Sequence, residues 1–239
     1  MKHRLYVPGP LQTGQTVQLQ PDRAHYLGRV LRLRRGSELL CFDGRGTAWR
    51  AEVEDDRSRT AAVRLLEVAD RQPEPRLRLH LVQGLLKGSA MDQVVQKATE
   101  LGATDLWPIL AARSNVSSEP SRQQRRLTHW RRIIESACEQ CGQLHLPVLH
   151  EPSDLATFLA APPDARMLML SPGAPAMPMS LPEGPLALLI GPEGGWHPQE
   201  ISLGERQGAD VRGLGALVLR AETAPLAALA AVRHGWGWR

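Results

Sequence analysis

The chain has 239 residues, of which 42% are hydrophobic, and a formal net charge of +4. This length can bury a substantial core and favours two domains. No apolar run is long enough to span a bilayer, and Met1 to Tyr6 lack the apolar stretch of a signal peptide. These features argue against a membrane or secreted protein, and we expect a cytoplasmic one.

Residues 1–72 have the pattern of a small β-rich domain. Short apolar stretches between glycine, proline or acidic turns predict strands at residues 5–7, 17–19, 39–42, 48–53 and 61–68. One helical segment, His25 to Leu33, is expected to place Val30 on the same side as Leu27. Asp43 to Gly46 (sequence DGRG) is typical of a hairpin turn. We therefore expect a small β-barrel with one helix.

From residue 73 to 239 strands alternate with helices, which is typical of a parallel sheet in an α/β domain. The expected strands lie near residues 77–81, 106–110, 167–170, 186–190 and 217–219. The expected helices run from Ser89 to Leu101 and from Ser121 to Cys141, and others begin near Pro198 and Glu222. Ser89 and Asp92, three residues apart, resemble a capping box at the first of these helices.

Three cysteines, Cys41, Cys138 and Cys141, form no disulfide framework because their number is odd. The Cys138-x-x-Cys141 spacing is also found at redox and metal sites. It falls inside the long helix, and no second pair completes a zinc site. We interpret both residues as helix-packing groups and expect no metal.

Two glycine-marked segments, Leu189 to Trp196 and Leu214 to Ala224, each run from apolar residues through a tight turn into a helix signal. In α/β sheets ligands bind beyond the carboxyl ends of the strands, where such turns lie. A phosphate ligand is disfavoured because the phosphate-loop pattern is absent and the Glu193 carboxylate would repel it. A neutral or cationic cofactor fits better, and S-adenosylmethionine, a sulfonium, is one.

All but three of the 29 basic residues are arginines. Arginine's planar guanidinium suits phosphate and base recognition. The arginines gather in two clusters, at Arg29, Arg32, Arg34 and Arg35 and at Arg122, Arg125, Arg126, Arg131 and Arg132. Two such clusters suggest a polyanionic partner, most plausibly nucleic acid, and two solvated helix faces are an equally good alternative on this pattern alone.

With these segments identified, the chain resembles the SPOUT class of S-adenosylmethionine-dependent RNA methyltransferases. The greatest similarity is to the methyltransferase E family, which methylates N3 of a uridine in 16S ribosomal RNA. The matching blocks are, in order, Lys97 to Gly102, Glu139 to Gly142, Ile190 to Gly195 and Leu219 to Ala224. Arg4 to Val7 and His25 to Arg32 resemble parts of that family's PUA-like RNA-binding barrel.

The resemblance implies a SPOUT-type parallel sheet with a C-terminal trefoil knot over 73–239 and a PUA-like barrel over 1–72. It also implies a homodimer that uses S-adenosylmethionine and acts on 16S rRNA in the small subunit. The implied cofactor contacts are Leu170, Ile190, Gly191, Pro192, Glu193, Gly194, Gly195, Leu214, Gly215, Leu219, Thr223 and Ala224. The candidate RNA contacts are Arg4, Arg29, Arg32, Arg122, Arg125 and Arg126.

Arg220 and Glu222 are the candidate catalytic residues. We expect Arg220 to stabilise negative charge on the uracil carbonyl oxygens, the alternative being a salt bridge to Glu222. Glu222 could orient Arg220, cap the following helix or act as the base, and we rank capping and orienting above the base. Ala90, Gln143 and Leu217 replace basic residues usual in the family. They leave open a different target base, a different RNA, or a non-catalytic assembly factor.

Overall fold

The computed structural model describes residues 3–57, 60–116, 119–178 and 181–237. The chain forms two compact units, one of Met1–Glu74 with Cys138–Leu146 and the other of Pro75–Ala137 with Pro147–Arg239. Among the described residues, none of the helices has both the length and the apolar character needed to cross a membrane.

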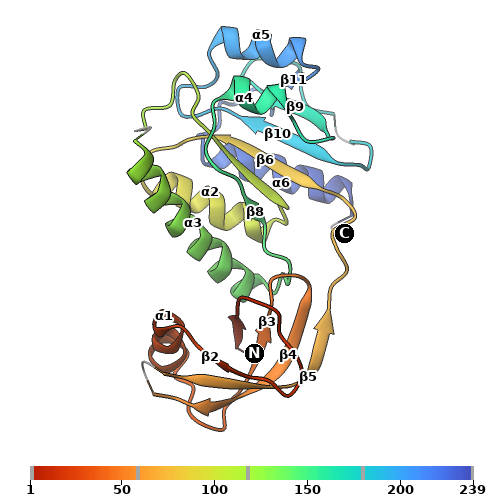
Figure 1. The fold of residues 1–239 in the computed structure, drawn as a ribbon. Helices are drawn as coiled ribbons and strands as arrows, with labels where there is room; N and C mark the ends of the chain where they lie inside the picture. The colour runs from red at the N-terminus through yellow and green to blue at the C-terminus, as the bar shows by residue number, and fades with distance from the viewer. Residues whose placement is uncertain (1–2, 58–59, 117–118, 179–180, 238–239) are drawn as a thin grey trace. The chain divides into compact units, whose positions relative to one another are not determined.

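The first unit contains a five-stranded sheet in the order β1-β3-β4-β5-β2 (Figure 1). Strand β1 runs parallel to β3, and the other neighbours are antiparallel. Each strand overlaps one expected from the apolar pattern. Their bounds are β1 Arg4–Tyr6, β2 Thr16–Gln18, β3 Glu38–Phe42, β4 Thr47–Asp55 and β5 Ala62–Arg71.

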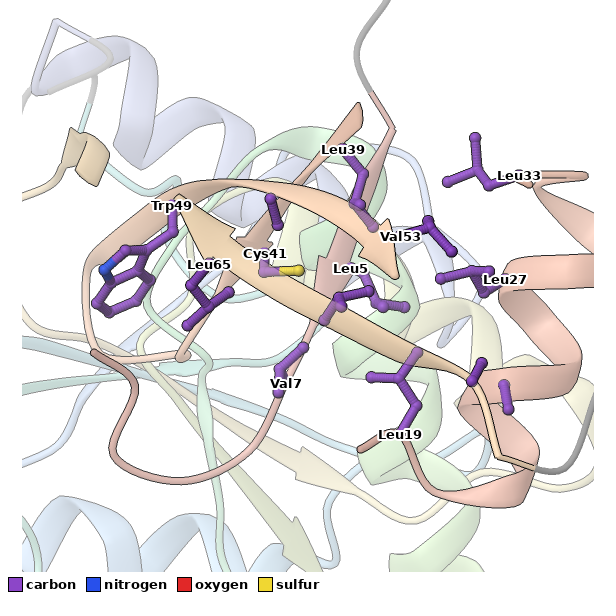
Figure 2. Close-up of a cluster of buried hydrophobic side chains, with 14 residues drawn as sticks. Leu5, Val7, Leu19, Leu27, Leu33, Leu39, Cys41, Trp49, Val53 and Leu65 are labelled. Carbon is purple, nitrogen blue, oxygen red and sulfur yellow. The ribbon is translucent and has the colours of Figure 1, made fainter. Parts of the chain in front are cut away.

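The core of this unit lies against one face of the sheet (Figure 2). In β4 the alternating residues Trp49, Ala51 and Val53 are buried, as the two-residue period of a strand requires. Leu27 reaches the same core from the helical segment. The sheet and the helical segment therefore share one core.

The helical segment differs from the expected His25–Leu33 helix. It begins earlier, as α1 (Pro21–His25), and continues as the π-helical turn η1 (Tyr26–Val30). A π turn adds one residue per turn and so shifts which side chains face the core. Leu27 is buried but Val30 is 59% exposed, so the prediction that both are on one packed face was wrong for Val30.

The segment Cys138–Leu146 packs with the first unit, although the sequence suggested one boundary after residue 72. Glu139 holds it there, because its Oε1 accepts the backbone N–H of Tyr6 at 2.9 Å and forms an ion pair with Arg23 at 2.9 Å. Cys138 is buried, as expected, whereas Cys141 is exposed. The helix-packing interpretation thus applies to Cys138 and was wrong for Cys141.

The second unit contains a six-stranded sheet in the order β11-β9-β10-β6-β7-β8. Every neighbouring pair is parallel, which confirms the expected α/β sheet. The strands are β6 Leu79–Gly84, β7 Asp105–Ile109, β8 Val148–Leu149, β9 Arg166–Leu170, β10 Leu186–Ile190 and β11 Asp210–Arg212.

Helices cover both faces of this sheet. Helices α4 and α5 pack on one face, against a core that contains Met169, Leu189 and Phe158, and Figure 1 shows α2 and α6 on the other. The helices of this half are α2 Ser89–Glu100, α3 Pro120–Cys141, α4 Leu155–Ala160, α5 Pro198–Arg206 and α6 Thr223–Gly235, and the end of α3 from Cys138 belongs to the first unit.

The strand expected at residues 217–219 does not form. The edge position beside β9 is taken by β11, which leaves the later apolar run without a strand to pair with. Leu217 and Val218 are 80% and 77% exposed in a loop that precedes α6. The apolar run predicted a strand, but β11 occupies the position in the sheet that this strand would need.

Candidate active site

One pocket lies at the carboxyl ends of β9 and β10, where the two glycine-marked segments meet. Three stretches of chain form it: one after β9, one after β10 and one before α6. The lining residues are Leu170, Ser171, Pro172, Ile190, Gly191, Pro192, Glu193, Gly195, Leu214, Gly215, Leu217, Val218, Leu219, Ala221 and Ala224. Of the expected cofactor contacts, Gly194 and Thr223 are outside this lining.

The loop after β10 turns sharply enough that two glycines are required. The Gly195 N–H donates to the Pro192 carbonyl at 2.8 Å, and Gly195 has a φ of +65°. A Cβ at Gly191 would lie 2.9 Å from the Trp196 nitrogen, too close for a rigid backbone neighbour. The two glycines therefore let the loop fold back on itself at the mouth of the strand.

Two side chains hold this loop, and the sequence interpretation missed both. The buried Gln83 amide at the end of β6 donates to the Gly191 carbonyl at 3.2 Å. Arg113 Nη1 donates to the Gly194 carbonyl at 2.9 Å. A polar residue within the otherwise apolar end of β6 was the one available signal for Gln83.

Glu193 connects this loop to the segment after β6. Its Oε1 accepts the backbone N–H of Lys87 at 2.9 Å, so its side chain ties the two loops together. Glu193 is also the one charged side chain in the described pocket lining. A pocket with a carboxylate and no cation is suited to a neutral or cationic ligand.

Arg220 and Glu222 lie beside the pocket but are not part of its lining. The Arg220 side chain is 86% exposed, and its Nη1 is 3.9 Å from Glu222 Oε1. Glu222 occupies the N-cap position of α6 without a side-chain capping bond. Its backbone is helical, with φ −81° and ψ −22°, unlike the extended conformation typical of a capping residue. Of the roles considered for Glu222, capping through a side-chain hydrogen bond is therefore not seen.

The helix start at His197 is as expected. Pro198 occupies the first turn of α5, and His197 and Glu200 form a reciprocal capping box. Trp196 is 4% exposed and belongs to the core beneath α4 and α5. These residues anchor the far end of the Gly191–Gly195 loop by packing.

The candidate RNA contacts are distributed over both units. Arg29 and Arg32 are exposed within and after η1 in the first unit. Arg4 is half-buried, with its guanidinium against Gly142, where an added Cβ would lie 3.0 Å away. The remaining three lie in the first turns of α3 in the second unit: Arg122, Arg125 and Arg126.

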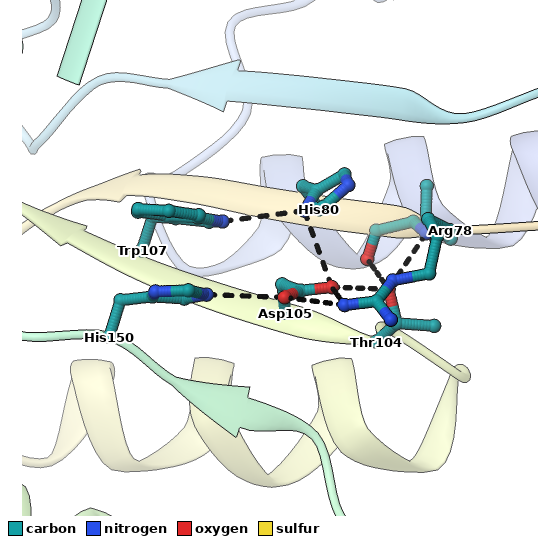
Figure 3. Close-up of polar contacts among 7 residues, drawn as sticks. Arg78, His80, Thr104, Asp105, Trp107 and His150 are labelled. Atoms are coloured by element: carbon teal, nitrogen blue, oxygen red, sulfur yellow. Dashed lines mark hydrogen bonds and ion pairs between the residues drawn. The ribbon is translucent and has the colours of Figure 1, made fainter. Parts of the chain in front are cut away.

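A cluster of charged and polar side chains around Asp105 lies at the opposite, amino end of the sheet (Figure 3). Asp105 accepts hydrogen bonds from Arg78 Nη2 at 2.9 Å and Thr104 Oγ1 at 2.7 Å, and lies 3.1 Å from His150 Nε2. Burial opposes ionisation of Asp105. The bonds from His150 and Thr104, with the charges of His80 and Arg78, outweigh it and hold its pKa at about 2. Perturbed groups often mark active sites, but this cluster joins β6, β7 and β8 away from the pocket, and we interpret it as structural.

A parallel sheet with a glycine-loop pocket beyond its carboxyl edge is the architecture of ligand-binding α/β domains. Residues 72–233 match the RNA methyltransferase domain family, and residues 19–66 match the RNA methyltransferase PUA domain. The chain therefore belongs to the RNA methyltransferase family that includes the ribosomal RNA small subunit methyltransferases E.

Individual relatives agree with this assignment. The ribosomal RNA small subunit methyltransferase E of Synechocystis sp. is 38% identical over 97% of this chain and 77% of the relative. The protein of the same name from Mycobacterium bovis is 30% identical over 95% of this chain and 89% of the relative.

Two solved structures are similar over 98% of both chains. One is a methyltransferase from Legionella pneumophila in complex with the bound cofactor S-adenosylmethionine, with a TM-score of 0.92 and 34% identity. The other is a ribosomal RNA small subunit methyltransferase E from Neisseria gonorrhoeae bound to S-adenosylmethionine, with a TM-score of 0.88 and 33% identity.

Proposed function

We propose that this protein transfers a methyl group from S-adenosylmethionine to N3 of a uridine in 16S rRNA of the small ribosomal subunit, near the decoding region. The observation that carries the proposal is the convergence of both glycine-marked segments on one pocket at the carboxyl ends of β9 and β10. Two similar structures hold S-adenosylmethionine, and the relatives are named for small-subunit rRNA.

The pocket residues fit that cofactor. The described lining is apolar apart from backbone groups, Ser171 and the Glu193 carboxylate. Apolar walls suit the adenine ring, and the carboxylate suits the positive sulfonium. When bound, the cofactor supplies an already activated methyl group. The protein then has to orient the uridine and stabilise charge.

Arg220 is our candidate for the charge-stabilising role. Loss of the N3 proton leaves negative charge on the uracil carbonyl oxygens, and a guanidinium beside the pocket would stabilise it. Its pair with Glu222 is long and exposed, so it holds Arg220 weakly. Glu222 is assigned the role of a loose partner that keeps Arg220 near the pocket, rather than that of a base.

The two domains divide the remaining work in this proposal. Residues 1–72 form a PUA-like barrel that contacts RNA through Arg4, Arg29 and Arg32. Residues 73–239 form the SPOUT domain, in which the chain after β9 is knotted around the cofactor, and two copies form a dimer. The exposed apolar pair Leu217 and Val218, which also lines the pocket, supports a partner copy there.

The test is incubation of the protein with labelled S-adenosylmethionine and small subunits from cells that lack it, followed by nucleoside analysis. We expect label in 3-methyluridine. Label in another nucleoside would replace the uridine N3 assignment with another target on the same fold. Calorimetry with S-adenosylhomocysteine is the second measurement. Cofactor binding without transfer to any RNA would favour the non-catalytic assembly factor, and no binding would contradict the enzymatic proposal.

A further inference from the structure

A second cavity, of about 500 Å³, lies in the second unit between the start of α2 and the first turns of α3. Its volume falls in the range of small-molecule sites. It shares no lining residue with the pocket described above. The lining residues are Leu86, Lys87, Gly88, Met91, Asp92, Asn115, Val116, Arg122, Arg126, His129 and Trp130.

The charge of this cavity is positive. Lys87, Arg122 and Arg126 line it, against one carboxylate, that of Asp92. Asp92 is directed to α3, where Oδ1 accepts the Trp130 indole N–H at 3.0 Å and Oδ2 lies 2.9 Å from His129 Nε2. Of the three cations, Arg122 also pairs with Glu119, Nε to Oε2 at 3.0 Å. With both oxygens of Asp92 engaged on α3, the lining still favours an anionic ligand.

The start of α2 supplies backbone N–H donors in addition to the cations. The sequence suggested a Ser89–Asp92 capping box, but the N-cap residue is Gly88, with φ +56°, and no side chain caps the helix. The capping-box prediction was therefore wrong, because Asp92 binds α3 instead. Uncapped N–H groups at the positive end of a twelve-residue helix favour an anion.

The cavity also adjoins the proposed cofactor pocket. The Lys87 N–H donates to Glu193, which lines that pocket. The loops after β6 and β10 are in close contact, since a Cβ at Gly84 would lie 2.6 Å from the Pro192 nitrogen. These two strands are neighbours in the sheet. A ligand in the second cavity would thus be separated from the methyl donor in the proposed cofactor pocket by these loops alone.

We propose that this cavity binds a phosphate group of the RNA strand next to the target nucleotide, and so positions that nucleotide for methylation. The proposal rests on the proposed function. Lys87, Arg126 and the start of α2 would contact the phosphate, while the buried Trp130 and Met91 form an apolar floor. Arg125 does not line the cavity, and its Nε donates to the Ser121 carbonyl instead.

The experiment compares Lys87→Gln and Arg126→Gln with Arg132→Gln. Arg132 is exposed on α3 and outside the cavity lining, so its replacement removes the same charge elsewhere on the helix. Affinity for a 16S-derived RNA is measured by fluorescence anisotropy over a series of salt concentrations. We expect about 5- to 10-fold weaker binding for each cavity variant and a salt slope smaller by about one. The control should change less than about 2-fold.

Four further measurements separate this inference from other causes. S-adenosylhomocysteine affinity should be unchanged in Lys87→Gln, because the bond to Glu193 comes from the backbone. Unchanged thermal midpoints would show that the variants fold, and Lys87→Arg should restore RNA affinity. Inorganic phosphate at millimolar concentration should compete with RNA for the wild-type protein and less for the variants.

Wild-type RNA affinity and salt slope in both cavity variants would overturn the inference, as would an equal loss in Arg132→Gln. Failure of the proposed function has a different signature, namely no methyl transfer by the wild-type chain. A chain that binds RNA through Lys87 and Arg126 but transfers no methyl group supports the cavity assignment and contradicts the enzymatic proposal. Methyl transfer by the wild-type chain, with RNA affinity unaffected in both cavity variants, would support the enzymatic proposal and contradict the cavity assignment.

Discussion

Gln83 shows how one buried amide can position a binding loop. It is 1% exposed, and its Nε2 donates both to Gly84 and to Gly191, 108 residues away. Each buried carbonyl would lose its donor if the amide were removed, at a cost of about 1–3 kcal/mol. The contact therefore links the end of β6 to the pocket loop after β10.

Replacing Gln83 with Met keeps the side-chain size and removes the donor. We expect about 10-fold weaker S-adenosylhomocysteine binding by calorimetry, because the Gly191 loop loses its support. Gln93→Met, on the exposed side of α2, is the control and should bind normally. Equal affinities in the two variants would show that Gln83 does not position the loop.

Arg220 is the residue on which the proposed chemistry depends most. Arg220→Ala should lower turnover about 100-fold or more, because a charge-stabilising donor acts mainly on the transition state. Because its exposed side chain is not part of the pocket lining, we expect nearly unchanged S-adenosylhomocysteine affinity. The measurement is the single-turnover methylation rate on small subunits, and a rate near wild type would remove Arg220 from the mechanism.

At the scale of elements, hydrogen bonds and ion pairs in the Asp105 cluster link three strands at the amino edge of the sheet. Arg78 precedes β6, Asp105 begins β7 and His150 follows β8. The Asp105 side chain is 4% exposed, so its charge depends on these partners. A buried carboxylate that accepts several hydrogen bonds contributes more than an exposed ion pair.

Asp105→Asn should lower the free energy of unfolding at neutral pH by about 3 kcal/mol, measured by urea denaturation. Asp210→Asn is the control. Asp210 forms more exposed pairs with Arg166 and Arg212, and its replacement should cost less than about 1 kcal/mol. Similar losses in the two variants would contradict a special role for Asp105.

The same cluster predicts how stability depends on pH. The pKa of Asp105 is lowered from 3.8 to about 2 on folding. Its contribution is present above pH 4 and lost as pH falls toward 2, a change of about 2 kcal/mol. Burial also lowers the pKa of His80, so protonation of the unfolded chain reduces stability below about pH 6.5. Asp105→Asn should flatten the loss between pH 4 and 2, and an unchanged profile would contradict this assignment.

At the scale of the whole molecule, the exposed apolar side chains of Leu217 and Val218 predict an interface with a second copy of the chain. We expect sedimentation velocity to give twice the 26.3 kDa mass of one chain. Changing both residues to Asp should shift the protein to the single-chain mass, because buried carboxylates would oppose the interface. Val148→Asp, at another exposed apolar residue, is the control. A single-chain mass for the wild-type protein would contradict the dimer.

The sequence alone was sufficient for features that depend on short stretches of chain. Most strands of both sheets followed from local apolar patterns, but β8 and β11 were missed and a strand was wrongly expected at residues 217–219. The two glycine loops could be found because tight turns need glycine at particular positions, as at Gly195 with φ +65°. Pro198 marked a helix start for the same kind of local reason.

Only the tertiary structure decided which distant residues meet. Placing β10 between β9 and β6 brings Gln83 and Lys87 to the Gly191–Gly195 loop, and no local pattern contains that order. Because β11 pairs with β9 at the sheet edge, Leu217 is left exposed. Glu139 attaches the end of α3 to the first unit through the Tyr6 N–H. Backbone conformation is set by neighbours in sequence, whereas contacts across a fold depend on the burial of all elements together.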